Sequence, residues 1–234
     1  MVKKLVAVGC SYTDPCYTFP VWPELLAKKL NFKCINLGQS GSGNECIFSK
    51  SLDILVKEKN IGLMVVMWSE FQRMDYYLGD IRGWDAIHYN VDGMIRNVRK
   101  WKEDVVDLLD TNGYNNKKHQ INRTLRFMYS LQKLCGMYDV PFLQVFGCDP
   151  CPQPEKYDAG KIILNSPFFN SIECLGWPII SSMGGWTIDT ELPRNETYRI
   201  SKKDSHPGKK GHEVITEILF DNVKKIPIRG EWNV

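Results

Sequence analysis

Short apolar runs alternate along the chain with longer segments in which apolar residues recur at helical spacing. The apolar runs at residues 5–8, 32–37, 61–68 and 140–146 have the length of buried strands. A strand, a helix and a second strand in this order need a crossover connection, which joins parallel strands. The pattern therefore predicts an α/β fold, a three-layer α/β/α sandwich with a mostly parallel sheet of about four or five strands.

The helical segments between these runs are amphipathic. Trp22, Leu25, Leu26 and Leu30 share one face, and Pro23 in the first turn favours a helix start there. The same spacing predicts helices through residues 47–56, across 95–109, across 118–136 with Gly136 as the C-cap, and across 214–223. We expect the last of these to dock beside the first strand.

The length of the chain limits the number of domains. Its 234 residues, of which 43% are hydrophobic, suit one well-filled α/β domain. We therefore expect a single domain over residues 1–234, with insertions at about 75–118 and 147–201. Long irregular segments of this kind usually serve as lids, specificity loops or partner surfaces.

Charge and hydropathy narrow the range of partners. The net charge is +3, and the basic residues are scattered among acidic ones, so nucleic-acid binding is not expected. No apolar stretch has the length of a membrane span, and the first residues lack a signal-peptide pattern. We expect no membrane association and a cytoplasmic location.

Eight cysteines would suit disulfides in a small secreted protein, but in a chain of this size without a signal-peptide pattern they are interpreted as reduced thiols. Cys148-x-x-Cys151 is the one close pair, and prolines follow it where a redox motif would have a helix and a zinc site a second ligand pair. Cys10 is expected to pack inside. We therefore predict neither a metal nor another cofactor.

Candidate chemistry lies near both ends of the sequence. The first strand runs into Gly9, Cys10 and Ser11, which places the Ser11 hydroxyl at the carboxyl end of a parallel strand, where open α/β sheets bind their ligands. Asp204 and His206 precede the last helix and supply the acid and base that a serine nucleophile needs. We therefore expect Ser11 and His206 to lie within hydrogen-bonding reach.

With Gly9-Cys10-Ser11 at one end and Asp204-x-His206-Pro207 at the other, the chain resembles the SGNH (GDSL-like) hydrolase family. The resemblance implies a flavodoxin-like sandwich and a carboxylic ester hydrolase in which Ser11 is the nucleophile, His206 the base and Asp204 the group that orients it. The implied substrates are small acyl esters, with O-acetyl groups on carbohydrates as one class.

Oxyanion stabilisation is the second requirement of such a site. The family has a glycine in the loop after the second strand, and Gly41 lies at the matching place, so the resemblance implies that the amides of Gly41 and Ser11 bind the oxyanion. Asn44 follows in the same loop as a further substrate-binding candidate. The alternative is a flexible loop in which Ser42 or Asn44 caps the next helix.

The chain departs from the family after the third strand. The family usually places Gly-x-Asn-Asp there, with an asparagine that donates to the oxyanion, and this chain has none at that point. Ser69, Gln72 and Arg73 are the candidate replacements, and Arg73 would also favour a negatively charged substrate. The alternative is that these residues cap the next helix or form salt bridges there.

A second departure concerns the acid. The family commonly places it three residues before the histidine, where this chain has Lys203, whereas Asp204 is only two residues before. The site is then either a distorted triad or a Ser–His dyad. These departures support a rival hypothesis, a catalytically degenerate domain that serves as a binding or structural module with a protein assembly partner, for example in a virus particle.

Overall fold

The computed structural model describes residues 2–79, 83–87, 100–112, 116–151 and 156–226. Its centre is a sheet in which every neighbouring pair of strands is parallel. The strands are β1 (Lys4–Gly9), β2 (Lys33–Asn36), β3 (Ile61–Trp68) and β6 (Phe142–Phe146), in the spatial order β2-β1-β3-β6. The predicted parallel sheet is confirmed.

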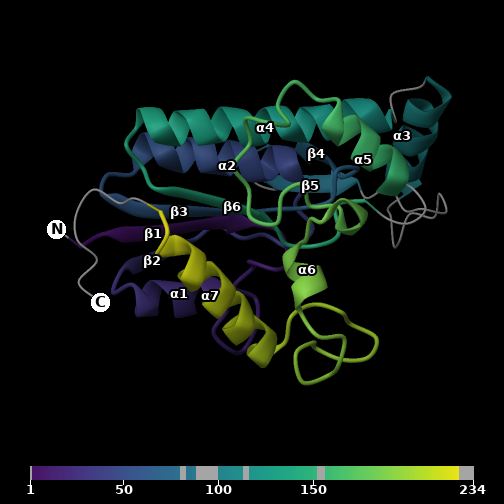
Figure 1. Cartoon of the computed structure of the whole chain (residues 1–234). Helices are drawn as coiled ribbons and strands as arrows, with labels where there is room; N and C mark the ends of the chain where they lie inside the picture. Colours follow the sequence, from purple (N-terminus) through teal and green to yellow (C-terminus); the bar gives the residue numbers. More distant parts are fainter. Residues whose placement is uncertain (1, 80–82, 88–99, 113–115, 152–155, 227–234) are drawn as a thin grey trace.

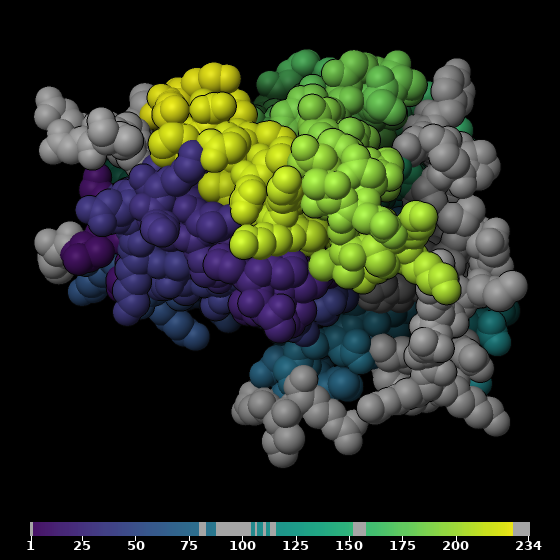
Figure 2. Space-filling model, turned by 90° about the horizontal axis from the view of Figure 1, so that it is seen from below, coloured from purple at the N-terminus to yellow at the C-terminus, as the bar shows by residue number. Residues whose placement is uncertain are grey.

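Helices cover both faces of this sheet, which confirms the three-layer prediction (Figure 1). One face carries α2 (Asn44–Lys57) and α4 (Lys117–Met137), and the other carries α1 (Trp22–Lys29) and α7 (Lys209–Val223). On the face drawn in Figure 2, the yellow C-terminal segment lies against the purple N-terminal segments. The fold therefore returns the end of the sequence to its beginning, as docking of the last helix requires.

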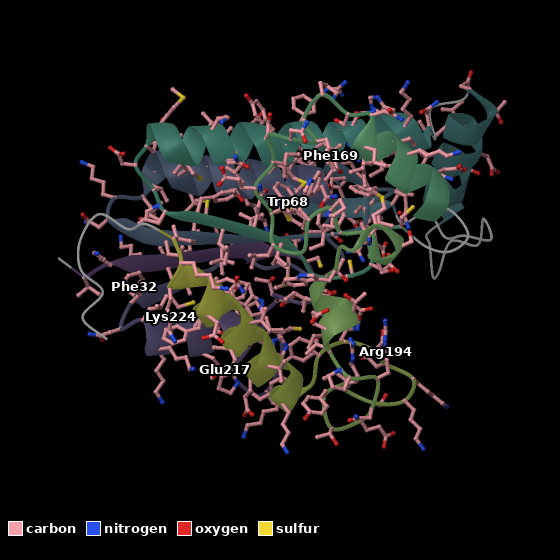
Figure 3. All side chains as sticks on the ribbon, viewed as in Figure 1. Phe32, Trp68, Phe169, Arg194, Glu217 and Lys224 are labelled. Carbon is pink, nitrogen blue, oxygen red and sulfur yellow. The ribbon has the colours of Figure 1, made fainter. Side chains whose placement is uncertain are left out.

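Alternate residues of the buried strands point into two separate cores, because successive side chains of a strand face opposite ways. Val6 and Val66 belong to the core beneath α2 and α4, together with Trp68, which lies between the sheet and these helices (Figure 3). Leu5 and Val65 belong to the core beneath α1 and α7. Both faces of β1 and β3 are thus buried, which explains their continuous apolar sequences.

The helix prediction needs two adjustments. Gly136 is not the C-cap of α4: the helix continues to Met137, and Asp139 takes the left-handed conformation with φ of 54°. The helix expected across 95–109 corresponds to α3 (Lys100–Thr111), and residues 95–99 lie outside the described residues.

Several short elements within the two expected insertions were not predicted. Strands β4 (Met74–Tyr77) and β5 (Trp84–Ile87) form an antiparallel pair, and their polar residues hide the strand pattern. The second region contains α5 (Lys156–Leu164), a 3₁₀ turn at Ser181–Met183 and the single-turn α6 (Ile188–Glu191). Across the described part of the chain, no helix combines the length and the apolar character needed to cross a membrane.

A buried histidine joins the two helices on one face of the sheet. His212, in the first turn of α7, is fully buried, and its Nδ1 accepts a hydrogen bond from the Trp22 amide at the start of α1, at 3.2 Å. Its Nε2 has no hydrogen-bond partner among the described residues. Burial lowers the pKa of His212 to about 4, so the imidazole is neutral at pH 7.

This histidine should make stability depend on pH. Its pKa is about 4 in the folded chain and about 6.5 in the unfolded chain. Between these values the unfolded state binds more protons, so the free energy of unfolding should fall by about 3 kcal/mol on acidification through this window. Chemical denaturation at a series of pH values measures the change.

The matched variant is His212→Asn, whose side-chain oxygen can still accept from the Trp22 amide but does not titrate. We expect it to be less stable at pH 7 and to show a flatter pH dependence between about pH 6.5 and 4. Equal slopes for the variant and the unmodified protein would contradict the assignment.

Candidate active site

Ser11 lies in a tight turn directly after β1. The amides of Thr13 and Asp14 both donate to the Cys10 carbonyl, at 2.8 and 3.1 Å, which closes the turn around Ser11. Gly9 is required at its start, since a Cβ there would lie 2.3 Å from the Thr13 hydroxyl oxygen. The turn thus fixes the Ser11 hydroxyl at the carboxyl edge of the sheet.

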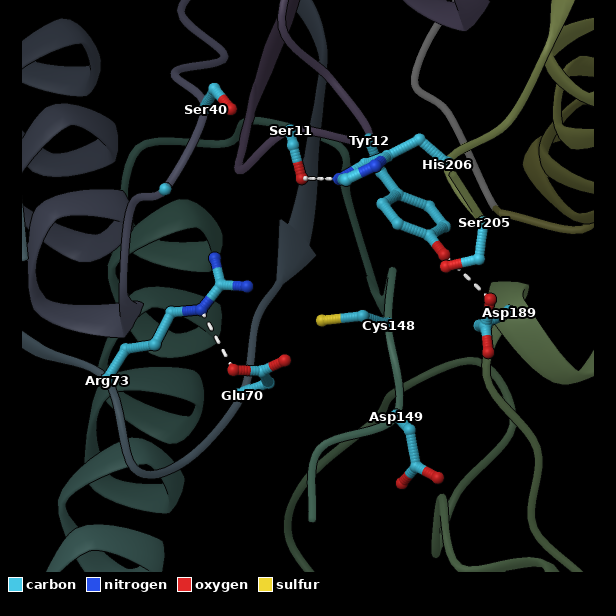
Figure 4. A pocket seen from close by; sticks show the side chains of 11 residues that line it. Ser11, Tyr12, Ser40, Glu70, Arg73, Cys148, Asp149, Asp189, Ser205 and His206 are labelled. Carbon is cyan, nitrogen blue, oxygen red and sulfur yellow. Dashed lines mark hydrogen bonds and ion pairs between the residues drawn. The ribbon is translucent and has the colours of Figure 1, made fainter. Parts of the chain in front are cut away.

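The side chains of Ser11, His206 and Asp204 form one hydrogen-bonded chain. Ser11 Oγ lies 2.9 Å from His206 Nε2, as Figure 4 shows, and His206 Nδ1 lies 2.6 Å from Asp204 Oδ1. Ser11 and His206 therefore lie within hydrogen-bonding reach, as predicted. This is the arrangement of nucleophile, base and orienting acid that serine hydrolases use.

The short spacing between acid and histidine does not break this chain. Asp204 Oδ1 accepts both the His206 amide, at 3.0 Å, and His206 Nδ1, so one carboxylate oxygen fixes the backbone and the ring of the same residue. Burial acts to raise the pKa of Asp204, but the hydrogen bonds from His206 outweigh it and leave that pKa below its usual value. The three side chains are therefore joined as a triad despite the short spacing, rather than reduced to a Ser–His dyad.

Backbone pairing holds the loop that carries Asp204 and His206. The amide of Ile200 donates to the His206 carbonyl at 2.9 Å, and the amide of Gly208 donates to the Tyr198 carbonyl at 2.8 Å. Asp204 and Ser201 exchange backbone hydrogen bonds in a turn between these pairs. The histidine therefore sits at the end of a short hairpin rather than in a free loop.

The buried Arg199 anchors this hairpin. Its guanidinium donates to Asp189 Oδ1 at 2.7 Å and to the Ser205 carbonyl at 2.8 Å, immediately before His206. It also donates to the Pro193, Leu192 and Asp189 carbonyls. One side chain thus connects α6, the segment after it and the loop of the base.

Asp189 links the same network to the nucleophile turn. The Tyr12 hydroxyl donates to Asp189 Oδ1 at 2.7 Å, and the Tyr12 ring lies against the His206 ring with centroids 5.7 Å apart. Burial would raise the pKa of Asp189, but the bonds from Tyr12 and Arg199 more than offset this and lower it. The carboxylate is therefore charged and is held by the residue next to Ser11.

The glycine-rich loop after β2 reaches the same edge. Asp14 accepts a hydrogen bond from the Ser40 amide, which ties the loop to the Ser11 turn. Gly41 has φ of 81° and lines the cavity together with Ser40 and Ser11. The predicted proximity of Gly41 to the nucleophile therefore holds, and the left-handed backbone explains the glycine there.

The start of α2 is capped by the side chain of Asp75. Its N-cap is Gly43 rather than Ser42 or Asn44, and the Asp75 carboxylate accepts from the amides of Gly43, Glu45 and Cys46 at 2.7 to 3.0 Å. A Cβ at Gly43 would lie 2.6 Å from this carboxylate. The hairpin strand β4 therefore supplies, from outside the helix, the cap that the helix's own sequence lacks.

Two further predicted site residues have structural contacts instead. The Asn44 amide donates to the carbonyls of Ser69 and Glu70, both at 3.2 Å, and to Thr124, while its oxygen accepts from the Ser69 amide at 2.8 Å. Asn44 and Ser69 are buried, and neither lines the cavity. Asn44 thus joins α2 to the end of β3, and Gln72 is likewise not among the cavity residues.

Arg73 does line the cavity, and it is buried. Its Nε donates to Glu70 Oε2 at 3.1 Å and its Nη1 to the Ser42 carbonyl at 3.0 Å (Figure 4). Arg73 therefore forms the salt bridge that the alternative predicted, and it also faces the cavity.

These residues enclose a cavity of about 520 Å³. Its walls come mainly from the segments that follow the strands of the parallel sheet. The lining residues are Ser11, Tyr12, Ser40, Gly41, Glu70, Arg73, Cys148, Asp149, Asp189, Ser205 and His206. Among the described residues, no group of histidine, cysteine and carboxylate side chains is arranged to hold a metal ion.

The cysteines near the site are free thiols. Cys10 is buried, as expected, and Cys148 faces the cavity with its sulfur 3.8 Å from Ser69 Oγ. Cys151 is buried in the opposite core and does not pair with Cys148.

No protein-family model and no curated protein matches this sequence. Solved structures do match. A protein from Desulfitobacterium hafniense, assigned to the G-D-S-L family of lipolytic proteins, has a TM-score of 0.51 at 12% identity, over 94% of this chain and 98% of that chain. The chain therefore has the fold of the SGNH, or GDSL-like, hydrolases, as the sequence resemblance predicted.

Two further matches have lower scores. A G-D-S-L family lipolytic protein from Veillonella parvula has a TM-score of 0.45 at 10% identity, over 94% of this chain and 97% of that chain. An acetyl xylan esterase from the rumen bacterium Butyrivibrio proteoclasticus has a TM-score of 0.47 at 11% identity, over 95% of this chain and 63% of that chain.

The residues that hold the catalytic side chains in place were not predicted from the sequence. Asp14 could have been found from the sequence. It lies three residues after Ser11 in a turn, and an Asp side chain in a turn often accepts hydrogen bonds from nearby backbone amides. Asp189 and Arg199 show no sequence pattern that indicates their role. They lie in the irregular region, far from Tyr12 in the sequence, and only the fold brings them into contact with it.

The two arginines on Asp189 allow a matched test of the anchor. Arg199 is buried and Arg194 is largely exposed (Figure 3), and both pair with the same carboxylate. Arg199→Met should lower the free energy of unfolding by about 3 to 5 kcal/mol, because it leaves a buried carboxylate without its main partner. Arg194→Met should lower it by under about 1 kcal/mol. Urea unfolding measures both, and equal small losses would contradict the anchoring role.

Proposed function

We propose that this protein is a serine esterase that hydrolyses small acyl esters, with Ser11 as nucleophile, His206 as general base and Asp204 as the group that orients the imidazole. The observation that carries the proposal is the continuous hydrogen-bonded chain from Ser11 Oγ through His206 to Asp204, open to a cavity. The hydrolase-type fold supports it. No cofactor takes part in the proposed reaction.

The proposed reaction has two halves. As Ser11 Oγ bonds to the ester carbonyl carbon, His206 Nε2 takes the hydroxyl proton, and it then gives this proton to the departing alcohol as the tetrahedral intermediate collapses to an acyl-enzyme. A water molecule then attacks the acyl group and passes a proton to His206, and Ser11 leaves with that proton. Throughout, Asp204 stabilises the imidazolium and keeps Nε2 directed at Ser11.

The oxyanion contacts are proposed to be the amides of Ser11 and Gly41, two residues that line the cavity. No asparagine is among the described residues that line the cavity, and the side chain of Asn44 is held by backbone partners instead. A site with one donor fewer is expected to be slower by a factor on the order of 10² to 10³.

A small acyl group suits the lining of the cavity. Polar and charged side chains predominate among the described residues that line it, which suits a short acyl group better than a long apolar chain. The finer proposal is therefore a short acyl group, such as acetyl, on a polar alcohol, and O-acetyl groups of carbohydrates belong to this class. A cytoplasmic location is the setting in which we propose that it acts.

Covalent labelling tests the nucleophile. A serine-directed fluorophosphonate should label the protein, and Ser11→Ala should abolish the labelling while leaving the fold unchanged by circular dichroism. Ser40→Ala and Ser205→Ala are matched controls, because both serines line the same cavity, and both variants should still be labelled. Labelling that persists in Ser11→Ala would rule out Ser11. A protein that is not labelled and hydrolyses no ester would favour the binding-module alternative, with a protein assembly partner.

A second prediction concerns the acid. Asp204→Asn should lower kcat by about a hundredfold or more, because the amide no longer fixes the tautomer and charge of His206. Lys203→Asn is the control, since Lys203 occupies the family's usual acid position and is exposed. It should leave kcat within about twofold of the unmodified protein. Steady-state hydrolysis of an aryl acetate measures both, and equal rates in the two variants would contradict a role for Asp204.

A further inference from the structure

An ion pair forms the wall of the cavity that faces the Ser11–His206 pair. Figure 4 shows Glu70 and Arg73 across the cavity from Ser11, with the guanidinium directed inward. Both residues follow β3, at the point where the family's asparagine would stand. The proposed esterase mechanism assigns no role to either of them.

Arg73 keeps one nitrogen available to a ligand. Its side chain is only 9% exposed, Nε is bound to Glu70, and Nη1 is bound to the Ser42 carbonyl. Nη2 donates to no group in the described part of the chain. Burial opposes the charge, but the Glu70 carboxylate beside the guanidinium helps to raise the pKa of Arg73, so the guanidinium stays protonated.

Glu70 keeps one oxygen available in the same way. Its Oε2 accepts from Arg73, and its Oε1 accepts no hydrogen bond from the described residues. The side chain is 29% exposed, which leaves it accessible from the cavity. The pair therefore presents a donor and a charged acceptor side by side.

This combination matches the hydroxyl groups of a polyol. A hydroxyl both donates and accepts, so neighbouring hydroxyls on a sugar ring satisfy Arg73 Nη2 and Glu70 Oε1 together. A carboxylate or phosphate would satisfy only the arginine. It would also meet Glu70, which already balances the charge of Arg73, and the carboxylate of Asp149 in the same cavity.

We infer that the Glu70–Arg73 pair is a specificity subsite that binds hydroxyls on the alcohol part of the ester, so that the preferred substrates are acyl esters of neutral carbohydrates or polyols. This inference rests on the proposed esterase function and assigns its alcohol. It departs from the expectation that Arg73 favours anionic substrates. A cavity of about 520 Å³ has room for a monosaccharide ester.

Three acetate esters built on six-membered rings test the subsite. They are methyl glucoside monoacetates, cyclohexyl acetate, which lacks the hydroxyls, and acetoxycyclohexane carboxylate, which carries a charge. The unmodified protein should hydrolyse the glucoside esters with a kcat/KM at least about tenfold above that of the other two, since one hydrogen bond to a charged group is worth about a factor of ten or more. Similar values for all three esters would overturn the inference.

Glu70→Gln is the decisive variant, because it keeps the size of the side chain and removes the charge that balances Arg73. We expect kcat/KM to fall about tenfold for the glucoside esters, to stay unchanged for cyclohexyl acetate and to rise for the carboxylate ester. Asp149→Asn removes the same charge from another wall and should not change the order of preference. An equal change for all three esters in Glu70→Gln would contradict the inference.

A binding measurement separates this inference from the proposed function. Saturation-transfer NMR with methyl glucoside and the Ser11→Ala variant detects the subsite without any hydrolysis. Binding that is lost when Glu70→Gln is added supports the subsite even if the unmodified protein hydrolyses no ester, in which case only the proposed function fails. Hydrolysis of cyclohexyl acetate without binding of methyl glucoside overturns the subsite and leaves the esterase.

Discussion

The pairing of β1 with β2 on one side and β3 on the other is the constraint on which the rest of the structure depends. Parallel pairing brings the carboxyl ends of all strands of this sheet to one edge, and each strand then delivers its following segment there. Ser11 follows β1, Gly41 follows β2, Arg73 follows β3 and Cys148 follows β6. The cavity is therefore a direct result of strand direction.

His206 reaches this edge by different means. No strand of the sheet leads into it, and the hairpin that carries it is fixed by Arg199 and Asp189, from the irregular part of the sequence. The buried ion pair needs the Tyr12 hydroxyl as a third member, so the turn of the nucleophile and the loop of the base share one carboxylate. The Asp189 network therefore fixes both the turn that carries Ser11 and the loop that carries His206, and so sets the distance between them.

The sequence was sufficient for the parts that depend on local periodicity. The strands of the parallel sheet and helices α1, α4 and α7 follow from apolar spacing. The positions of Ser11 and His206 follow from strand direction and a family resemblance. The cap of α2 was not predictable, because Asp75 lies 32 residues from Gly43 in a strand with no clear pattern. Asn44 was assigned to the site for its amide, which only the fold shows to be used between α2 and the end of β3. Such contacts depend on tertiary placement, which propensity does not encode.

Ser11 and His206 are separated by 195 positions in sequence, and they meet only through β1 and the hairpin before α7. A chain still under synthesis on the ribosome therefore has a serine hydroxyl with no base beside it, until the segment that contains His206 has emerged. The same separation means that a break between the two segments yields fragments neither of which contains the pair. Reconstitution of the Ser11–His206 pair from two such fragments would then report directly that they had assembled into the native sheet.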